Sequence, residues 1–502
     1  MKKVFTLFVF LMGALATWAT DYTDTLIVKV NQVSSNQKAT ISVEEKDGLY
    51  TLTLKNFILE TGGSKMPVGN IQLTQLTPET SGDNIILNAH QDIQITSGDD
   101  PANASWMGPR LGTVPVNLKA RLTGEKLFTA INIEMIGQSI SVTFGSGMQL
   151  NNPGFEYWHT SKIDEEDKKT YQEPNGWHSF DSGKGSLISL AGHHIAISND
   201  AHSGNHSACI FSSSVFGIIA NGTMTTGRMN ADGFAATDTT NNAHIDPSDT
   251  DKDGNGDPFY ATITNRPDSM VVYLKFKQGT VNDQHPYATV SAALTDGTYY
   301  QEPQDKTYTN VIATAQDKTI ATTDGKWKRI AIPFAYTGYE AAPKHLFVTI
   351  STNADPGQGS DKDSVWVDDI SLVYNAKATN ITVAGKGIGF NPATTSYQVD
   401  AAGTITADDI AVTLDGQGAF ATKTLTTKDG MTTAIVKVYS ADLQQTSSYT
   451  LQISSATGIQ NIPVNGKDVR IYNVSGQQVK SMQHGNVYIL KDAQGHTKKV
   501  AK

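Results

Sequence analysis

The stretch NNPGFEYWH (151–159) and the distant stretch VWVDDISLVY (365–374) decide how the middle of this chain folds. Both have the residue types of β-strands, yet each carries acid: Glu156 in the first, Asp368 and Asp369 in the second. In a jelly roll, the first and last strands of the module lie close together, because the sandwich brings its ends to one side. We therefore predict a single β-sandwich between the two stretches, in which the three carboxylates meet.

These three carboxylates predict a cation at the place where they meet. Grouped acids repel one another unless a cation lies between them, and Ca²⁺ accepts carboxylate and carbonyl oxygens in a flexible geometry. A structural calcium ion beside Glu156, Asp368 and Asp369 is therefore one interpretation. The alternative is that these acids face solvent on edge strands.

A second acidic string, DTDKDGNGD (249–257), resembles the first half of an EF-hand calcium loop. Asp249, Asp251 and Asp253 supply oxygen ligands at the required spacing, and a glycine follows for the sharp turn. Tyr260 stands where that loop needs a bidentate Glu. The string is therefore either a weak calcium site or a solvated acidic turn, and we favour the turn.

The composition indicates an exported, multi-domain, all-β protein. A chain of 502 residues is too long for one core, and its 43 Gly and alternating strand patterns favour β domains. Residues 1–19 combine Lys2 and Lys3 with a short apolar run and a small-residue ending, which is typical of a signal peptide rather than a membrane span. We expect the mature chain at the cell surface, in the periplasm or outside the cell. The net charge of −10 argues against nucleic acid and anionic membranes as partners.

Residues 20–147 contain eight alternating segments, TLIVKVNQV and VNLKARLTG among them, which suit a closed up-and-down barrel. The order LKNFIL, MPVGNIQL, GTVPVNL and a final SVTFG resembles the calycin-like, lipocalin-like β-barrel domains of secreted Bacteroidetes proteins. The resemblance implies a barrel that either holds an apolar ligand or is packed solid, and we favour the packed interior.

Residues 148–375 resemble a family along their whole length. The motifs are NNPGFEYW, PNGWHSF, NRPDSMVVYLKFKQG, WKRIAIPFAY and VWVDDISLVY, in this order. Together they are similar to the carbohydrate metabolism domain of Bacteroidetes, which has a galactose-binding-like jelly roll. The resemblance implies glycan binding or a glycan-associated surface function, and a fold alone does not establish an activity.

Two shorter β regions follow the jelly roll. Residues 376–454, with GFNPATTSYQV and a final SYTLQI, look like the immunoglobulin-like or cadherin-like sandwiches that serve as spacers on bacterial surface proteins. Residues 455–502, with VRIYNVSGQQVKS and KKVAK, resemble the C-terminal sorting domain of the type IX secretion route. The alternative for this last region is a small β module that caps the preceding sandwich.

Sugar binding without catalysis needs flat aromatic faces that stack on a pyranose, with amides and carboxylates at its rim. Trp327 and Trp366 lie within alternating strands and are predicted to be core. Six other aromatic residues lie near predicted loops or strand ends of the jelly roll and are candidates for stacking, with core packing as the alternative: Tyr157, Trp158, Tyr171, Trp177, Tyr299 and Tyr300.

Histidines and the single cysteine give weaker signals. His193, His194, His202 and His206 lie close in sequence and suggest zinc. Neighbouring histidines on a strand point to opposite faces, so we favour a role in turns over a metal site. Cys209 lies in the strand pattern HSACIFSS and is predicted to be a buried structural thiol.

These observations favour a secreted or cell-surface protein whose jelly roll binds glycan, with the flanking β domains as spacers and other surface proteins as further partners. The first alternative is a glycoside hydrolase or lyase with a carboxylate pair in the same module. The second alternative is a non-catalytic structural or adhesion protein. The acids available to an enzyme include Asp164, Glu165, Glu166, Asp167 and Glu173.

Overall fold

The computed structural model describes residues 19–30, 33–61, 64–103, 105–135, 138–164, 168–428, 430–456, 469–483, 485–493 and 495–501. The predicted signal peptide lies outside these residues except for Ala19, and so do Glu165, Glu166 and Asp167. The chain divides into two compact units: residues 1–375 with 416–419 and 440–445, and residues 376–415 with 420–439 and 446–502.

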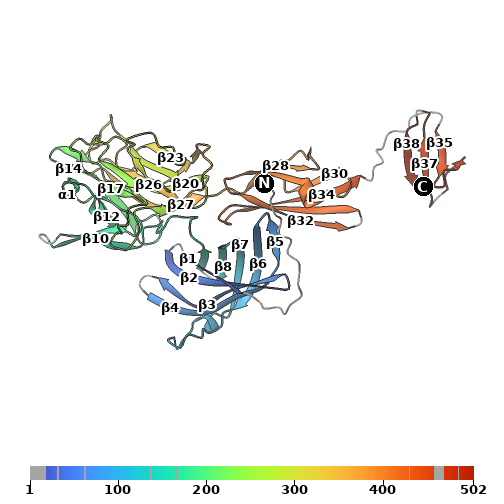
Figure 1. Ribbon diagram of the computed structural model, residues 1–502, viewed down its shortest axis with the longest axis horizontal. Coiled ribbons are helices and arrows are strands. Elements are labelled where there is room, and N and C mark those ends of the chain that lie inside the picture. Colours follow the sequence, from blue (N-terminus) through green and yellow to red (C-terminus); the bar gives the residue numbers. More distant parts are fainter. Residues whose placement is uncertain are drawn as a thin grey trace, which may run out of the picture. The chain divides into compact units, whose positions relative to one another are not determined.

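The prediction of an all-β protein is confirmed. In the described ranges, the helical elements are one short helix, α1 (Ile188–Ala191), and three 3-10 turns, η1 (Gly108–Arg110), η2 (Phe180–Ser182) and η3 (Ala407–Asp409). No helix in this part of the chain is both long enough and apolar enough to cross a membrane. All other regular elements are strands (Figure 1).

The first region of the larger unit is a nine-stranded antiparallel sheet in the order β4-β3-β2-β1-β9-β8-β7-β6-β5. Inward side chains such as Leu26, Val116 and Leu118 alternate with outward polar ones and form one apolar cluster. The sequence predicts eight strands in a closed barrel, whereas the described sheet has nine strands in an open order that ends at β4 and β5. Asn70 of β4 and Thr96, two residues after β6, exchange two backbone hydrogen bonds of 2.9 and 3.1 Å across the opening. The strands are β1 (Ala19–Val30), β2 (Val33–Lys46), β3 (Leu49–Thr61), β4 (Ser64–Leu76), β5 (Pro78–Ser81), β6 (Asn84–Gln94), β7 (Thr113–Thr123), β8 (Lys126–Met135) and β9 (Gln138–Phe144).

The second region is a sandwich of two antiparallel sheets around a shared core. Val272 and Val367 of the five-stranded sheet and Val290 and Val348 of the six-stranded sheet belong to that core. The five-stranded sheet runs β12 (Ile195–Ser198), β13 (Ser207–Phe211), β27 (Ser364–Val373), β20 (Ser269–Lys277) and β24 (Lys328–Pro333). The six-stranded sheet runs β16 (Thr223–Thr225), β26 (His345–Ser351), β21 (Ala288–Thr295), β23 (Val311–Ile320) and β25 (Ala335–Tyr336), with β19 (Ala261–Thr262) paired to β26.

Three smaller sheets accompany this sandwich. They are the hairpin of β10 (Trp158–Asp164) and β11 (Lys169–Pro174), the hairpin of β14 (Ser213–Val215) and β15 (Ile218–Ala220), and a three-stranded sheet of β17 (Arg228–Asn230), β18 (Asn242–Ile245) and β22 (Tyr300–Glu302).

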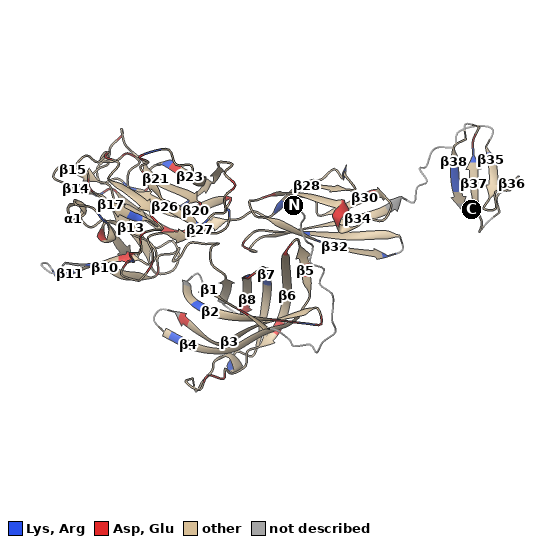
Figure 2. Ribbon diagram, viewed as in Figure 1, with Lys and Arg blue, Asp and Glu red and all other residues tan. Residues whose placement is uncertain are grey.

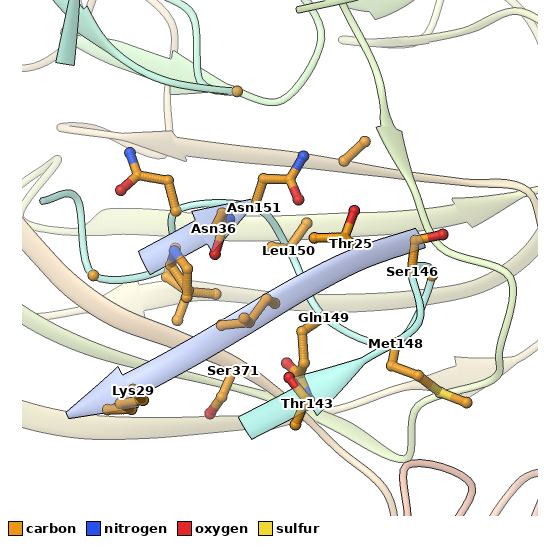
Figure 3. A pocket seen from close by; sticks show the side chains of 18 of the residues that line it. Thr25, Lys29, Asn36, Thr143, Ser146, Met148, Gln149, Leu150, Asn151 and Ser371 are labelled. Atoms are coloured by element: carbon orange, nitrogen blue, oxygen red, sulfur yellow. The ribbon is translucent and has the colours of Figure 1, made fainter. Parts of the chain in front are cut away.

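The two stretches that carry the predicted acids meet directly. The Ile370 backbone N–H donates to the Pro153 carbonyl at 2.9 Å. The side-chain amide of Gln149 bonds both the carbonyl and the N–H of Leu372, at 2.6 and 2.8 Å. Figure 3 shows Gln149 between Met148 and Leu150 on the wall of a cavity of about 850 Å³. The neighbourhood predicted for residues 151–159 and 365–374 is therefore present.

The smaller unit is also built from strands. A three-stranded sheet of β29 (Lys386–Gly387), β28 (Lys377–Val383) and β31 (Ile410–Asp415) and a four-stranded sheet of β30 (Ser396–Ala402), β34 (Thr446–Ala456), β33 (Met431–Tyr439) and β32 (Phe420–Lys428) share one apolar cluster. The last sheet contains β36 (Gln478–Val479), β35 (Arg470–Asn473), β37 (Val487–Lys491) and β38 (Thr497–Ala501). Figure 2 shows charged residues scattered over the strands, with a basic segment on β38.

Candidate functional site

The predicted acids hold a loop in place. Glu156 Oε1 accepts the backbone N–H groups of Asn205 and His206, at 2.7 and 3.1 Å. Asp368 Oδ2 accepts those of His202 and Ser203, at 2.8 and 3.2 Å. Glu156 and Asp368 therefore lie around one turn, residues 200–206, and satisfy four of its backbone donors, which would otherwise lack partners. Accepting hydrogen bonds from this turn is thus the observed role of Glu156 and Asp368.

Asp369 completes the attachment of this turn. Its Oδ2 lies 2.7 Å from His202 Nδ1, and its Oδ1 accepts the Ser203 hydroxyl at 2.9 Å. Burial, followed by the neighbouring Asp369 charge, raises the pKa of Asp368 to about 7. In the described part of the chain, no three His, Cys, Asp or Glu side chains are grouped so as to hold a metal ion. The calcium ion at Glu156, Asp368 and Asp369 stays a prediction.

The second acidic string lies against cations. Asp249 Oδ2 is 2.8 Å from Lys184 Nζ and 3.0 Å from Arg228 Nη1, and Asp251 pairs with the same two side chains. The hydrogen bond from Lys184 is the largest influence that lowers the pKa of Asp249, to about 2. Asp253 is buried, and its Oδ2 lies 3.3 Å from His178 Nε2. The Asp249 and Asp251 oxygens are thus already neutralised by basic side chains, which favours the acidic-turn interpretation.

The four histidines that suggested zinc have separate local partners. His193 Nδ1 is 2.6 Å from Asp181, and His194 Nδ1 is 2.7 Å from the Phe211 carbonyl. His202 bonds Asp369, whereas His206 is part of the turn that Glu156 holds. These contacts agree with a role in turns. Cys209 as a whole is partly exposed, in contrast to the predicted full burial. Partial burial still raises the pKa of its thiol to about 11, so the thiol stays protonated near neutral pH.

Two of the six predicted stacking residues are core residues. Trp177 and Tyr300 are 0% exposed, so neither ring has a free face; the stacking prediction is wrong for both, and the alternative of core packing is observed. Their neighbours in sequence are polar, which made both look like loop residues, but tertiary packing covers them. Glu173, one of the candidate catalytic acids, is also fully buried and accepts the backbone N–H and hydroxyl of Ser179.

The other four predicted aromatics are accessible to different degrees. Tyr299 is 37% exposed, and its ring lies 5.7 Å from that of His244 in a stacked arrangement. Trp158 packs against the sandwich core and donates its indole N–H to the Phe155 carbonyl at 2.6 Å. The residues with half-buried side chains are Tyr157, Trp158 and Tyr171.

Trp327 and Trp366 lie on the outer face of the five-stranded sheet, and the prediction that they are core is wrong. Lys275 pairs with Trp366 across the sheet, and its ammonium lies 4.7 Å from the Trp327 ring centre and 5.4 Å from that of Trp366. This ammonium also forms an ion pair with Asp200. In VWV, the two valines face the core, so the alternation of a strand places Trp366 on the other side.

A groove with a volume of about 390 Å³ lies on the outer face of the six-stranded sheet. Thr289 and Ser291 of β21 lie opposite Ser351 and Thr349 of β26, and Gln316 of β23 donates to the Ser291 hydroxyl at 3.3 Å. The residues between them, such as Val290 and Ile350, face the core. We call this feature the sheet groove. Its floor therefore presents hydroxyl groups, one amide and one ammonium: Thr289, Ser291, Gln316, Lys318, Thr349 and Ser351.

The walls of the sheet groove are apolar and exposed. Phe216 and Phe234 are 89% and 79% exposed, and Ile218 and Leu190 are 47% and 44% exposed. Monomeric soluble proteins rarely expose large apolar side chains together unless the patch binds something. A groove with a polar floor and aromatic walls is therefore a candidate binding site, and its chemistry suits an amphipathic ligand.

The backbone of Phe216 has a positive φ, which is unfavourable for phenylalanine. It is the first residue of the two-residue β14–β15 turn, where both Phe216 and Gly217 have positive φ, 51° and 81°. Turns of this kind prefer Asn-Gly, because a side chain with a bulky Cβ substituent is strained at positive φ. Since the ring is also almost fully exposed, Phe216 stabilises neither the turn nor the core. Strain of this sort concentrates at binding sites.

The loop that carries Phe234 is held rigidly by side-chain hydrogen bonds. Asn241 accepts the Asp232 and Gly233 N–H groups at 3.1 and 2.9 Å and donates to the Gly233 and Ala235 carbonyls at 2.8 and 2.9 Å. The loop is therefore ordered before a ligand arrives, which lowers the entropy cost of binding.

Catalytic groups are scarce in the sheet groove. Among the described residues that line it, Glu302 is the one carboxylate and Lys318 the one cation. Glu302 accepts a hydrogen bond from the Tyr300 hydroxyl. Glycoside hydrolysis by the usual routes requires two carboxylates that flank the scissile bond. The described lining of the groove therefore lacks the carboxylate pair that these routes use.

Sequence reasoning missed both phenylalanines of the sheet groove. Each has a recognisable signal: VFGII places large apolar residues at a two-residue hairpin turn, and DGFAATDTTNN places one aromatic in an otherwise polar loop. The floor residues have none, because outward Thr and Ser are common on any sheet.

The nine strands of the first region pair with their neighbours in sequence, except β4 with β5, and β1 also pairs with β9; this is the topology of small up-and-down β-barrel domains. Over residues 18–146 the chain matches the calycin-like β-barrel domain family. This match confirms the resemblance of the first region and covers that region alone. Among curated proteins, none matches the chain significantly.

Proposed function

We propose that the chain is a non-catalytic glycan-binding protein and that the sheet groove is its binding site. The single observation that carries the proposal is the pairing of a hydroxyl- and amide-bearing floor with two exposed phenyl rings, Phe216 and Phe234. A pyranose has an apolar face of C–H groups that stacks on aromatic rings and a rim of hydroxyls that hydrogen-bond to polar side chains. A lipid would not use the polar floor, and a highly charged ligand would find few opposite charges.

The flanking β regions act in this proposal as presenters of the sandwich. The calycin-like region has an apolar cluster of its own, and so has the smaller unit. Export and display at the cell surface belong to the same proposal, because an exposed glycan site serves a protein that meets glycans outside the cell.

A glycan array with the full chain tests the proposal. We expect binding to at least one glycan, a loss of binding in Phe234→Ala and a weaker signal in Gln316→Ala. Val281→Ala is the matched control, because Val281 is 76% exposed in the same sandwich and does not line the groove. Release of reducing sugar from the bound glycan would instead support the enzyme alternative, and unchanged binding in Phe234→Ala would exclude the sheet groove.

A further inference from the structure

The sheet groove has more apolar surface than ring stacking requires. Stacking of one or two pyranoses uses the faces of Phe216 and Phe234. The lining also contains apolar side chains that a plain hexose leaves without partners, among them Leu190, Val215, Ile218, Ile219, Ala191 and Ala220. Apolar surface that stays hydrated in the complex contributes nothing to affinity, so this lining fits a ligand with apolar groups beyond its ring C–H face.

The charges of the groove limit the ligand further. Lys318 is the one cation in its lining, and Glu302 is the one anion. Uronates and sulfated sugars are recognised by clusters of Arg and Lys that bond each anionic group with several donors. The groove therefore lacks the groups that would repay the desolvation of a polyanionic glycan.

Resting on the proposed function, we propose that the sheet groove selects neutral sugars that carry a methyl group, either N-acetylhexosamines or 6-deoxyhexoses. The methyl of the acetamido group or of C6 packs against the aliphatic wall around Leu190 and Ile218, while the ring stacks on a phenylalanine and its hydroxyls face the Thr and Ser floor. Each buried methyl strengthens binding roughly fourfold.

Two matched ligand pairs test this inference by calorimetry or ligand-observed NMR. Chitohexaose and cellohexaose differ in the acetamido group, and methyl α-L-fucoside and methyl α-L-galactoside differ in the C6 hydroxyl. We expect the member with the acetamido group, or the member with the C6 methyl group, to bind about four- to tenfold more tightly than its counterpart in at least one pair, and the pair that discriminates identifies the sugar class.

Variants of the aliphatic wall separate this inference from the proposed function. Leu190→Ser and Ile218→Ser should bring the affinity ratio of the discriminating pair toward one while the unsubstituted sugar keeps its affinity, whereas Val281→Ser should leave the ratio unchanged. Equal affinities within both pairs, or a ratio that neither wall variant changes, would overturn the methyl selectivity and leave glycan binding intact. A failure of all four ligands and of the glycan array would overturn the proposed function together with this inference.

Discussion

Replacing Phe216 with Asn separates the two roles that an exposed aromatic side chain can have. In a turn with positive φ at both central residues, Asn is among the preferred residues, whereas an ordinary L-residue pays roughly 1–2 kcal/mol for the left-handed region. The ring is 89% exposed, so its removal sacrifices little buried area. We therefore expect the free energy of unfolding of Phe216→Asn to stay the same or to rise by about 1 kcal/mol.

The effect on binding should have the opposite sign. Aromatic stacking on a flat ligand contributes about 1–3 kcal/mol, which corresponds to a dissociation constant roughly 5- to 150-fold larger in Phe216→Asn. Titration calorimetry with the glycan found on the array measures this loss. Differential scanning calorimetry measures the stability, for which 1 kcal/mol shifts the midpoint by about 2–4 °C in a domain of this size.

Val281→Asn is the control, because it also replaces an exposed apolar residue of the sandwich. A clear fall in the unfolding midpoint of Phe216→Asn would mean that the ring packs against the protein and that the reasoning from exposure and strain is wrong. Unchanged affinity would remove Phe216 from the binding site.

Three further predictions concern the turn at residues 200–206. Gly204→Ala should destabilise the native state by about 1–3 kcal/mol in a denaturant titration, because its φ is +70° and a Cβ would collide with Glu156 Oε1. Gly256→Ala is the control: Gly256 has a φ of +88° and open space around it, so this variant should lose only the strain energy. Equal losses in the two variants would contradict the role of the collision. The raised pKa of Asp368, about 7, means that the native state binds more protons than the unfolded chain between about pH 4 and 7. The unfolding free energy contributed by this group therefore falls as the pH rises through that window. Asp368→Asn should flatten this pH dependence in urea titrations, and an unaltered pH dependence would exclude Asp368 as its source. If calcium binds at Glu156, Asp368 and Asp369, a chelator should lower the melting temperature by mass action, and an identical melting curve with and without chelator would end the calcium interpretation.

The all-β architecture and the meeting of residues 151–159 with 365–374 were predictable because both depend on local alternation and on the way a sandwich returns its last strand to its first. The partners of the acids were not predictable. Glu156, Asp368 and Asp369 accept hydrogen bonds from a turn that is distant from both stretches in sequence, and no local pattern identifies which backbone N–H groups will need an acceptor. Carboxylates that lie close together in a fold need a group of positive charge or partial positive charge beside them. Here backbone N–H groups serve in that role for Glu156 and Asp368.

The burial of the aromatic residues was also predicted incorrectly in two cases. Trp177 looked like a loop residue and is buried, whereas Trp366 looked like a core residue and lies beside Lys275 on the outer face. Strict alternation would have corrected the second error, since the valines on both sides of Trp366 occupy the core-facing positions. It does not correct the first error, because the burial of Trp177 comes from segments packed over a loop.

The β14–β15 turn joins its strands through only two residues, and the strand register on both sides, Val215 with Ile218, is set without the Phe216 side chain. Other residues at this position, above all Asn and Gly, which the positive φ favours, are therefore compatible with the same sandwich. If Phe216 stacks on a glycan as proposed, a single codon change here alters the ligand-facing surface while the buried contacts are inherited intact. Diversification at the tip of this hairpin is thus uncoupled from the evolution of the core beneath it.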